Sequence, residues 1–297
     1  MYELIQVGKN TFYMDCPSKV GFFKTGDNEV VLIDAGSDKD AAKKVKRILD
    51  EQGWNLKAIY ITHSHADHIG GNQYLQNQTG CKIYAHKIER SASESPIFEP
   101  ALLYGGFPLS ELRNKFVLAK EAEVEKLTED ALPEGMTMIE LPGHSYDMVG
   151  YRTSDNVLFL ADSVISEESL EKHKVFFLYD VKAHLETLEM IKTLEADCFV
   201  PSHARHTTDI VELTQKNIDK TNEIIEAIKK ILETPKSFEN LLAEVFTHFD
   251  MNMEIQQRML AGFVIKSFLA YMKSEGYIDF SFENNIMIWH KAEKQEQ

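Results

Sequence analysis

Four potential metal ligands fall within six consecutive positions of this sequence. Residues 62–71 read THSHADHIGG and contain His63, His65, Asp67 and His68. No helical or strand repeat requires such a cluster. In an extended segment, a period of two places His63, His65 and Asp67 on one side and His68 on the other. A chain that turns here presents ligands in two directions, so the stretch is suited to two metal ions.

Three further potential ligands follow later in the chain. His144, Asp162 and His203 each lie at or just past the end of an apolar, strand-like run, as His63 does. Loops at strand ends are where binding and catalytic sites are usually built. Imidazoles and carboxylates suit zinc, and catalytic zinc sites keep one position open for water. Seven ligands are too many for one tetrahedral ion, so we expect a pair of metals.

Alternating strands and helices are expected to position these residues. Short apolar runs separated by turn signals predict strands and hairpins from the start of the chain to Asp34. An apolar stripe predicts an amphipathic helix over residues 38–52. Further strands and helices then follow, namely strand AIYIT, a helix from Ile69 to Thr79, strand CKIYAH, strand MTMIELP, a hairpin over YRTSDNVLFLAD, a helix from Val181 to Glu195 and strand DCFVPSH.

Two segments depart from this alternation. Residues 87–133 contain prolines, a YGGF segment and a charged run, ELRNKFVLAKEAEVEKL, that we expect to be helical. We interpret them as an insertion that acts as a lid or pocket wall. Residues 210–297 predict long helices, one capped by Ser237, followed by a hairpin. We therefore divide the chain into a catalytic domain, 1–209, and a small winged-helix-like domain, 210–297.

Composition limits the function classes. The 297 residues include 32 basic and 47 acidic side chains, a net charge of −15, which argues against nucleic acid or an anionic membrane as partner. No run approaches a membrane span, and the N-terminus lacks the features of a secretory signal, so we expect a cytoplasmic protein. The three cysteines, Cys16, Cys81 and Cys198, are expected to be small buried residues and not a disulfide framework.

Five sequence blocks together resemble the metallo-β-lactamase-fold hydrolases, which include glyoxalase II and the β-lactamase-like 2 ribonucleases. The blocks are IDAG, THSHADHIGG, LPGH, FLAD and PSH, in the order found in that family. The resemblance implies an α+β, four-layer αββα sandwich with metals at one edge. It further implies a first metal held by His63, His65 and His144, a second held by Asp67, His68 and His203, a bridging Asp162, and support from Asp34.

The sequence departs from the family pattern next to two ligands. GHSYDMVG stands where the family often has GHTPG, and PSHARH stands where many relatives have PGHG. We therefore expect Tyr146, Arg205 and His206 to contact substrate, with a structural role as the equal alternative. Tyr104 and Phe107 of the insertion are expected to serve as a pocket wall, with simple packing as the alternative.

These observations predict a binuclear metal-dependent hydrolase of a small cytoplasmic metabolite, with an ester or thioester as first choice. A metal-bridged hydroxide attacks, while Asp67 orients it or carries its proton. We expect two divalent ions, zinc first, with manganese or iron as alternatives. Apolar residues of the tail suggest a homodimer.

Two other functions are weighed against this one. A persulfide dioxygenase would bind a single iron through His63, His144 and Asp162. A ribonuclease or phosphodiesterase would use the tail to bind nucleic acid. Residues 210–297 carry 10 basic and 14 acidic side chains, a net charge of −4, which argues against the nucleic-acid alternative.

Overall fold

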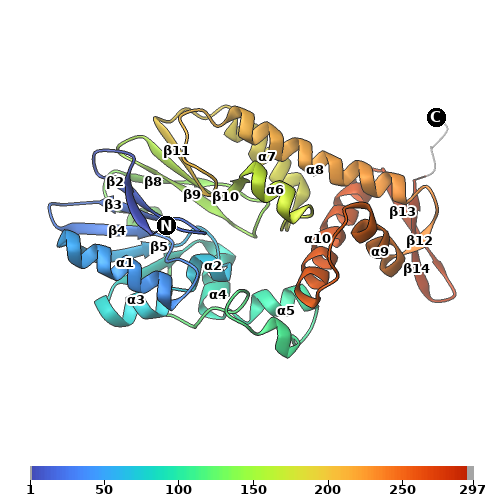
Figure 1. Cartoon of the computed structure of the whole chain (residues 1–297), viewed down its shortest axis with the longest axis horizontal. Coiled ribbons are helices and arrows are strands. Elements are labelled where there is room, and N and C mark those ends of the chain that lie inside the picture. Colours follow the sequence, from blue (N-terminus) through green and yellow to red (C-terminus); the bar gives the residue numbers. More distant parts are fainter. Residues whose placement is uncertain (1, 293–297) are drawn as a thin grey trace.

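The first of two large β-sheets is built from the N-terminal part of the chain (Figure 1). The structure is a computed structural model that describes residues 2–292. Strands β1 to β4 form an antiparallel meander, and β4 to β7 continue the sheet in parallel. The strands are β1 (Glu3–Gln6), β2 (Thr11–Asp15), β3 (Val20–Lys24), β4 (Glu29–Ile33), β5 (Asn55–Tyr60), β6 (Lys82–Ala85) and β7 (Glu125–Lys126).

The second sheet has the order β11-β10-β9-β8 and consists of β8 (Met136–Glu140), β9 (Val149–Thr153), β10 (Val157–Ile165) and β11 (Cys198–His203). Strands β9 and β10 form the predicted hairpin, and Asn156 in its turn has a φ of 56°. Strand β11 runs parallel to β10. The ends of β10 and β11 therefore bring Asp162 and His203 to neighbouring positions.

The two sheets pack face to face, with helices on both outer faces. A shared core joins inward side chains of the first sheet, such as Ile33 and Tyr60, to Tyr151 and Val200 of the second. Helices α1 (Lys39–Gln52), α2 (Ala66–Ile69) and α3 (Asn72–Thr79) cover the first sheet, while α7 (Val181–Ile191) and α8 (Val211–Ile231) cover the second. The predicted αββα sandwich of the α+β class is confirmed.

The insertion contains less helix than expected. It holds α4 (Lys87–Glu94), α5 (Phe98–Tyr104) and the 3-10 turns η1 (Ser110–Leu112) and η2 (Glu129–Ala131). The predicted charged helix over ELRNKFVLAKEAEVEKL is wrong. The end of that run forms β7, which pairs with β6, while Val124 and Leu127 are buried. Strand pairing and burial here outweigh the helix propensity of Glu, Lys and Ala.

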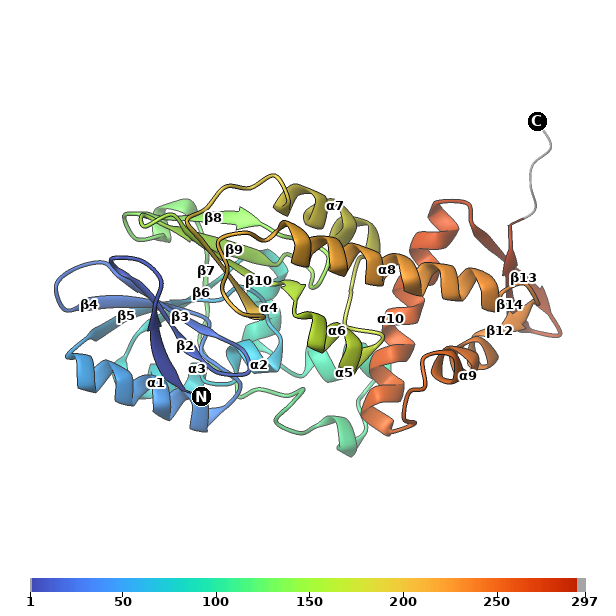
Figure 2. The same ribbon diagram turned by 45° about the horizontal axis from the view of Figure 1, so that its top comes forward.

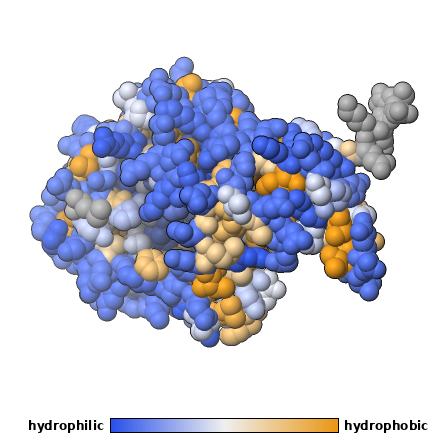
Figure 3. Space-filling view, turned by 45° about the vertical axis from the view of Figure 1, so that its right-hand side comes forward, coloured by the Kyte–Doolittle hydropathy of each residue, from blue (hydrophilic) through white to orange (hydrophobic). Residues whose placement is uncertain are grey.

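The insertion exposes several large apolar side chains among its charged residues. Large side chains are exposed on it, including those of Phe98, Phe107 and Phe116. Figure 3 shows apolar residues gathered in the middle and lower part of this face. Helix α5 and turn η1 lie beside helix α10 (Ile255–Ser274), as both ribbon views show (Figure 2). The insertion and the C-terminal segment are therefore neighbours in space.

The C-terminal segment follows the predicted order of elements. After α8 come β12 (Lys236–Ser237), α9 (Phe238–His248), α10, β13 (Ile278–Glu283) and β14 (Ile286–Lys291), with strand order β12-β14-β13. The Ser237 side chain caps α9 by accepting a hydrogen bond from the amide of Asn240. The assignment as a winged-helix-like domain stays a prediction, and residues 293–297 lie outside the described part of the chain.

Helix α8 connects the sandwich to this C-terminal segment. Ile218, in its first half, packs into the core under the second sheet. Ile224 and Ile228, farther along, pack with α9 and α10. A second helix, α6 (Glu167–His173), contributes Leu170 to that same core. The predicted boundary at residue 209 therefore falls before a helix that is shared by two hydrophobic cores.

Two smaller expectations concern the cysteines and the membrane. Cys16, Cys81 and Cys198 are all buried and unpaired, as predicted. Among the helices of residues 2–292, none combines the length and apolar character that crossing a bilayer requires.

Candidate metal centre

The seven predicted ligands come together at one edge of the sandwich as two adjoining groups. His63, His65 and His144 form the first, and Asp67, His68, Asp162 and His203 form the second. Within each group, one nitrogen or oxygen atom per residue lies within 4.8 Å of the others.

In the first group, three imidazole nitrogens converge. The Nδ1 atom of His65 lies 3.0 Å from Nε2 of His63 and 3.0 Å from Nε2 of His144. A ring nitrogen carries either one proton or one lone pair. Nδ1 of His65 can therefore make a good hydrogen bond to only one of its two neighbours at a time. A cation between the three lone pairs satisfies them all.

Asp162 lies between the two groups. Its Oδ2 atom is 3.0 Å from Nε2 of His203, 3.6 Å from Nε2 of His144 and 4.0 Å from Nε2 of His63. Its Oδ1 atom lies 3.2 Å from Nε2 of His68. This placement fits the bridging role that the resemblance implies.

Chain turns at the strand ends place these ligands. His63 and His65 follow β5, and the chain then turns into α2, which carries His68. This turn requires glycine at position 71, because a Cβ atom there would lie 2.1 Å from the carbonyl oxygen of Ala35. His144 follows Gly143, whose φ of 124° favours glycine.

Asp34 lies beneath the ligands and contacts one of them, His68, as well as Thr62. Its Oδ2 atom accepts hydrogen bonds from Nδ1 of His68 and from the Thr62 hydroxyl, both at 2.8 Å. Its Oδ1 atom accepts one from the Thr62 amide. The bond to Nδ1 directs Nε2 of His68 toward Asp162, as carboxylates commonly do for metal-binding histidines. His203 is fixed similarly, because its Nδ1 lies 2.8 Å from the Pro17 carbonyl oxygen.

Glu89 is a site residue that the sequence analysis missed. This fully buried carboxylate accepts hydrogen bonds from the amide and hydroxyl of Ser64 at 2.8 and 2.6 Å. Its other oxygen accepts bonds from the Ser145 hydroxyl at 2.7 Å and the Asp147 amide at 3.1 Å. Glu89 therefore ties the loop of His63 and His65 to the loop of His144. Its position in the insertion, far from the motifs in sequence, gave no signal.

The two groups differ in their electrostatics. Burial lowers the pKa of His63 well below its usual value and that of His144 to about 3, so both rings are neutral. Burial acts in the same direction on His68 and His203, but the carboxylates of Asp162 and Asp67 outweigh it. They raise the pKa of His68 well above its usual value and that of His203 to about 10. The second group thus attracts positive charge.

The residues present fit divalent metal ions. Nε2 of His68 and Oδ1 of Asp162 are buried and point into the centre without a hydrogen-bond partner of good geometry. Buried polar atoms in proteins normally have partners, so such a pair indicates a ligand position. The donors are imidazole nitrogens and carboxylate oxygens, the set that zinc, manganese and iron share.

A cleft with a volume of about 400 Å³ opens onto the ligands. His65, Asp67, His144, Asp162 and His203 line one side of it. The insertion and α10 supply the opposite wall. The cleft is large enough for a small molecule and places it against both ligand groups.

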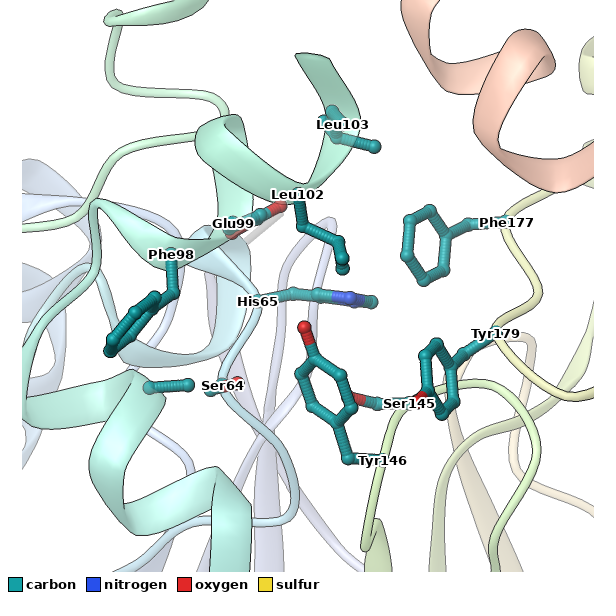
Figure 4. A pocket seen from close by; sticks show the side chains of 11 residues that line it. Ser64, His65, Phe98, Glu99, Leu102, Leu103, Ser145, Tyr146, Phe177 and Tyr179 are labelled. Atoms are coloured by element: carbon teal, nitrogen blue, oxygen red, sulfur yellow. The ribbon is translucent and has the colours of Figure 1, made fainter. Parts of the chain in front are cut away.

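A narrow recess of about 20 Å³ adjoins this cleft beside His65, with room for about one water molecule. Figure 4 shows that the Tyr146 hydroxyl group points toward His65 from below, while Phe177 lies across from it. Tyr146 and Tyr179 contact each other with ring centroids 4.6 Å apart. Burial and the nearby Glu89 raise the pKa of Tyr146 to about 12, so its hydroxyl group stays a hydrogen-bond donor.

The other expected substrate contacts fall in different places. Arg205 and His206 line an open groove that adjoins the cleft at His203. His206 also pairs with the Tyr13 hydroxyl group at 2.9 Å, which gives it a structural contact. Tyr104 and Phe107 are 42% and 77% exposed and do not line the cleft. The expected pocket wall from the insertion is instead formed by other residues.

The fold is that of a known class. Residues 13–203 match the family model described as the metallo-beta-lactamase superfamily, and the chain belongs to this superfamily. It is similar to a hydroxyacylglutathione hydrolase of Rhodopseudomonas palustris (strain BisB18), with 31% identity over 135 residues, 44% of this chain and 43% of that protein. It is also similar to "Probable metallo-hydrolase YflN" of Bacillus subtilis (strain 168), with 26% identity over 70% of this chain and 83% of that protein.

Solved structures extend the likeness in fold over almost the whole chain. A beta-lactamase domain protein from Burkholderia ambifaria aligns with a TM-score of 0.73 and 15% identity, over 98% of this chain and 94% of that one. A metallo-beta-lactamase family protein from Thermus thermophilus aligns with a TM-score of 0.69 and 16% identity, over 97% of each chain. At such identities these structures establish the fold alone. The chain spans less than half of the first relative, the hydroxyacylglutathione hydrolase.

Proposed function

We propose that this protein is a binuclear metal-dependent hydrolase that cleaves an ester or thioester of a small metabolite. The observation that carries the proposal is the pair of ligand groups joined by Asp162 and opening onto one cleft. Superfamily membership and the similarity to hydroxyacylglutathione hydrolases support metal-dependent hydrolysis.

The residues of the chain have distinct roles in this proposal. His63, His65 and His144 would hold one ion, His68, His203 and Asp67 would hold the other, and Asp162 is placed between the two groups. When bound, the ions would polarise the scissile carbonyl group and lower the pKa of a coordinated water.

Asp67 is placed to orient the attacking water. It lines the cleft, and its Oδ2 atom accepts a hydrogen bond from the Ser18 hydroxyl group. Burial alone would raise the pKa of Asp67, but His68 and His203 outweigh burial and hold the pKa below its usual range. An ionised carboxylate accepts hydrogen bonds only, so Asp67 orients water as an acceptor.

Two features disfavour the alternative functions. A single iron bound by His63, His144 and Asp162 would not account for the convergence of His68 and His203 on Asp162. A ribonuclease would need cations along its substrate, yet no Lys or Arg lines the cleft that faces the ligands in the described part of the chain. Ester or thioester hydrolysis by two metals therefore has the better support.

Metal analysis combined with a substrate panel tests the proposal. The purified protein is expected to hold close to two equivalents of divalent metal and to hydrolyse esters or thioesters. Phosphodiesters, short single-stranded RNA and a persulfide with oxygen serve as competing substrates. One equivalent of iron with oxygen consumption, or cleavage of RNA alone, would replace this function by one of the alternatives.

A further inference from the structure

The cleft that faces the ligands has two chemically unlike walls. The sandwich contributes the predicted metal ligands on one side. The insertion contributes Glu99, Leu103, Phe116 and Val117 to the other, and α10 adds Gln257 and Leu260. The second wall is thus mainly apolar and comes from segments outside the sandwich.

The apolar wall reaches the first ligand group. Phe177 lines the cleft with its ring centroid 4.5 Å from that of His65 and 5.4 Å from that of His144. Phe116 is 71% exposed at the cleft, and the ammonium group of Lys115 lies 5.5 Å from its ring. An apolar ligand in the cleft would remove this exposed phenyl ring from water, which is favourable.

The neighbouring groove is polar and carries charges of both signs. Lys19, Arg205 and Lys216 line it together with Glu167, Glu168, Asp209 and Glu212, and the groove shares Ser169 and His203 with the cleft. The amine of Lys19 is held by the carbonyl oxygens of Ala204 and Ser202, and Lys216 pairs with nearby acidic groups. The Arg205 side chain is exposed. An apolar compartment therefore adjoins the first ligand group, and a polar groove with a guanidinium group adjoins the second.

We propose that the cleft takes the alkyl chain of an acyl ester or acyl thioester, with the polar leaving group in the groove near Arg205. This inference rests on the hydrolase function proposed above. It predicts that the protein prefers substrates with an unsubstituted alkyl acyl group to substrates with a polar hydroxyacyl group. Hydrolysis adds water across the acyl bond, so the carboxylic acid stays in the cleft and the alcohol or thiol leaves through the groove.

A binding series tests the alkyl site without requiring turnover. Alkyl hydroxamates from acetyl to octanoyl are titrated into the metal-loaded protein by calorimetry. Affinity is expected to rise about three- to fourfold for each methylene that becomes buried. Equal affinity across the series, or tighter binding of a hydroxyacyl hydroxamate than of its alkyl counterpart, would overturn the proposal.

Matched variants locate the site. Phe116→Ala and Leu260→Ser are expected to weaken octanoyl hydroxamate roughly tenfold, the worth of two buried methylenes, and to leave acetyl hydroxamate unchanged. Phe282→Ala and Ile255→Ser change exposed apolar residues that do not line the cleft, so they should bind like the parent protein. Equal losses in the controls would contradict the location.

Kinetics separate this inference from the general function. With acyl thioesters of one polar thiol, Arg205→Ala should raise KM by a similar factor for every chain length, since it acts on the leaving group. Absence of hydrolysis of all esters and thioesters, together with chain-length-dependent binding, would reject the proposed function and keep the alkyl site. Hydrolysis without any chain-length preference would keep the proposed function and reject the alkyl site.

Discussion

At the scale of single residues, the ligands are oriented by hydrogen bonds with neighbouring residues. Asp34 directs His68, the Pro17 carbonyl oxygen directs His203, and Glu89 joins the two loops that carry the first group. Such partners fix the orientation of the imidazoles and are commonly worth 10–100-fold in metal affinity. Glu89 is the least expected of them because no motif surrounds it.

Replacing Glu89 tests this role. In Glu89→Gln, an amide NH2 group replaces one oxygen and faces donors from Ser64 or Ser145, so buried donors lose their acceptor. We expect a loss of about 1–3 kcal/mol in the free energy of unfolding and weaker metal binding, measured by denaturant titration and chelator competition. Glu94→Gln, on the same helix and partly exposed beside Arg90, should change both by little. Unchanged metal affinity in Glu89→Gln would contradict the positioning role.

Metal binding is expected to release protons from the second group. The raised pKa values of His68 and His203 mean that both rings carry a proton at neutral pH until a cation displaces it. Metal affinity should therefore fall as the pH falls below the pKa of His203, about 10, because protons compete more strongly. Calorimetry of zinc binding in buffers with different ionisation enthalpies measures the release. An observed heat that is independent of the buffer at neutral pH would contradict the prediction.

At the scale of elements, the site depends on how closely the turn after β5 approaches the turn after β4. The glycines that end the THSHADHIGG block allow this approach, because α2 and its following residues pack against the Asp34 loop. Both turns carry ligands or their supports, so their separation sets the geometry of the second group.

A methyl group at Gly71 should disturb this packing. Its Cβ atom would lie 2.1 Å from the backbone oxygen of Ala35, and a backbone atom cannot move aside cheaply. We expect Gly71→Ala to lower the melting temperature by several degrees, about the effect of 1–3 kcal/mol, and to reduce the bound metal. Gly106→Ala is the control, since its Cβ atom meets nothing closer than 3.8 Å. Equal melting temperatures for the two variants would show that the loop adapts.

At the scale of the whole molecule, the C-terminal segment is part of the site's surroundings. Phe263 of α10 stacks on Phe177 with ring centroids 5.2 Å apart and planes 14° apart. Phe177 in turn contacts His65 and His144. A hydrophobic core shared by α6, α8, α9 and α10 holds this arrangement in place.

This stack predicts that a residue far from the motifs influences metal binding. Phe263→Ala removes the ring that supports Phe177, so the imidazoles of the first group lose part of their packing. We expect a several-fold weaker metal affinity, measured by chelator competition, and a destabilisation of about 1–3 kcal/mol. Phe282→Ala, at an exposed position of β13, should behave as the parent protein. Parent-like metal affinity in Phe263→Ala would show that the C-terminal segment does not influence metal binding.

The sequence by itself determined the ligand types and most of the strands and helices, and its resemblance to the metallo-β-lactamase-fold hydrolases implied the sandwich. Histidine and aspartate at the ends of apolar runs point to metal chemistry whatever their exact placement, and strand and helix periods are local properties of the chain. The same locality explains why the Ser237 cap and the two hairpins, β9–β10 and β13–β14, were predictable.

The division of the ligands was implied by the resemblance and not by local geometry, and what surrounds them was decided only by the tertiary structure. An extended period of two placed Asp67 with His63 and His65, but the turn into α2 moves Asp67 to the side of His68. The charged run of the insertion has helical composition, yet pairing with β6 makes its end a strand. Glu89 and the apolar wall from α10 depend on contacts between distant segments, and such contacts are formed by packing, which no local pattern encodes.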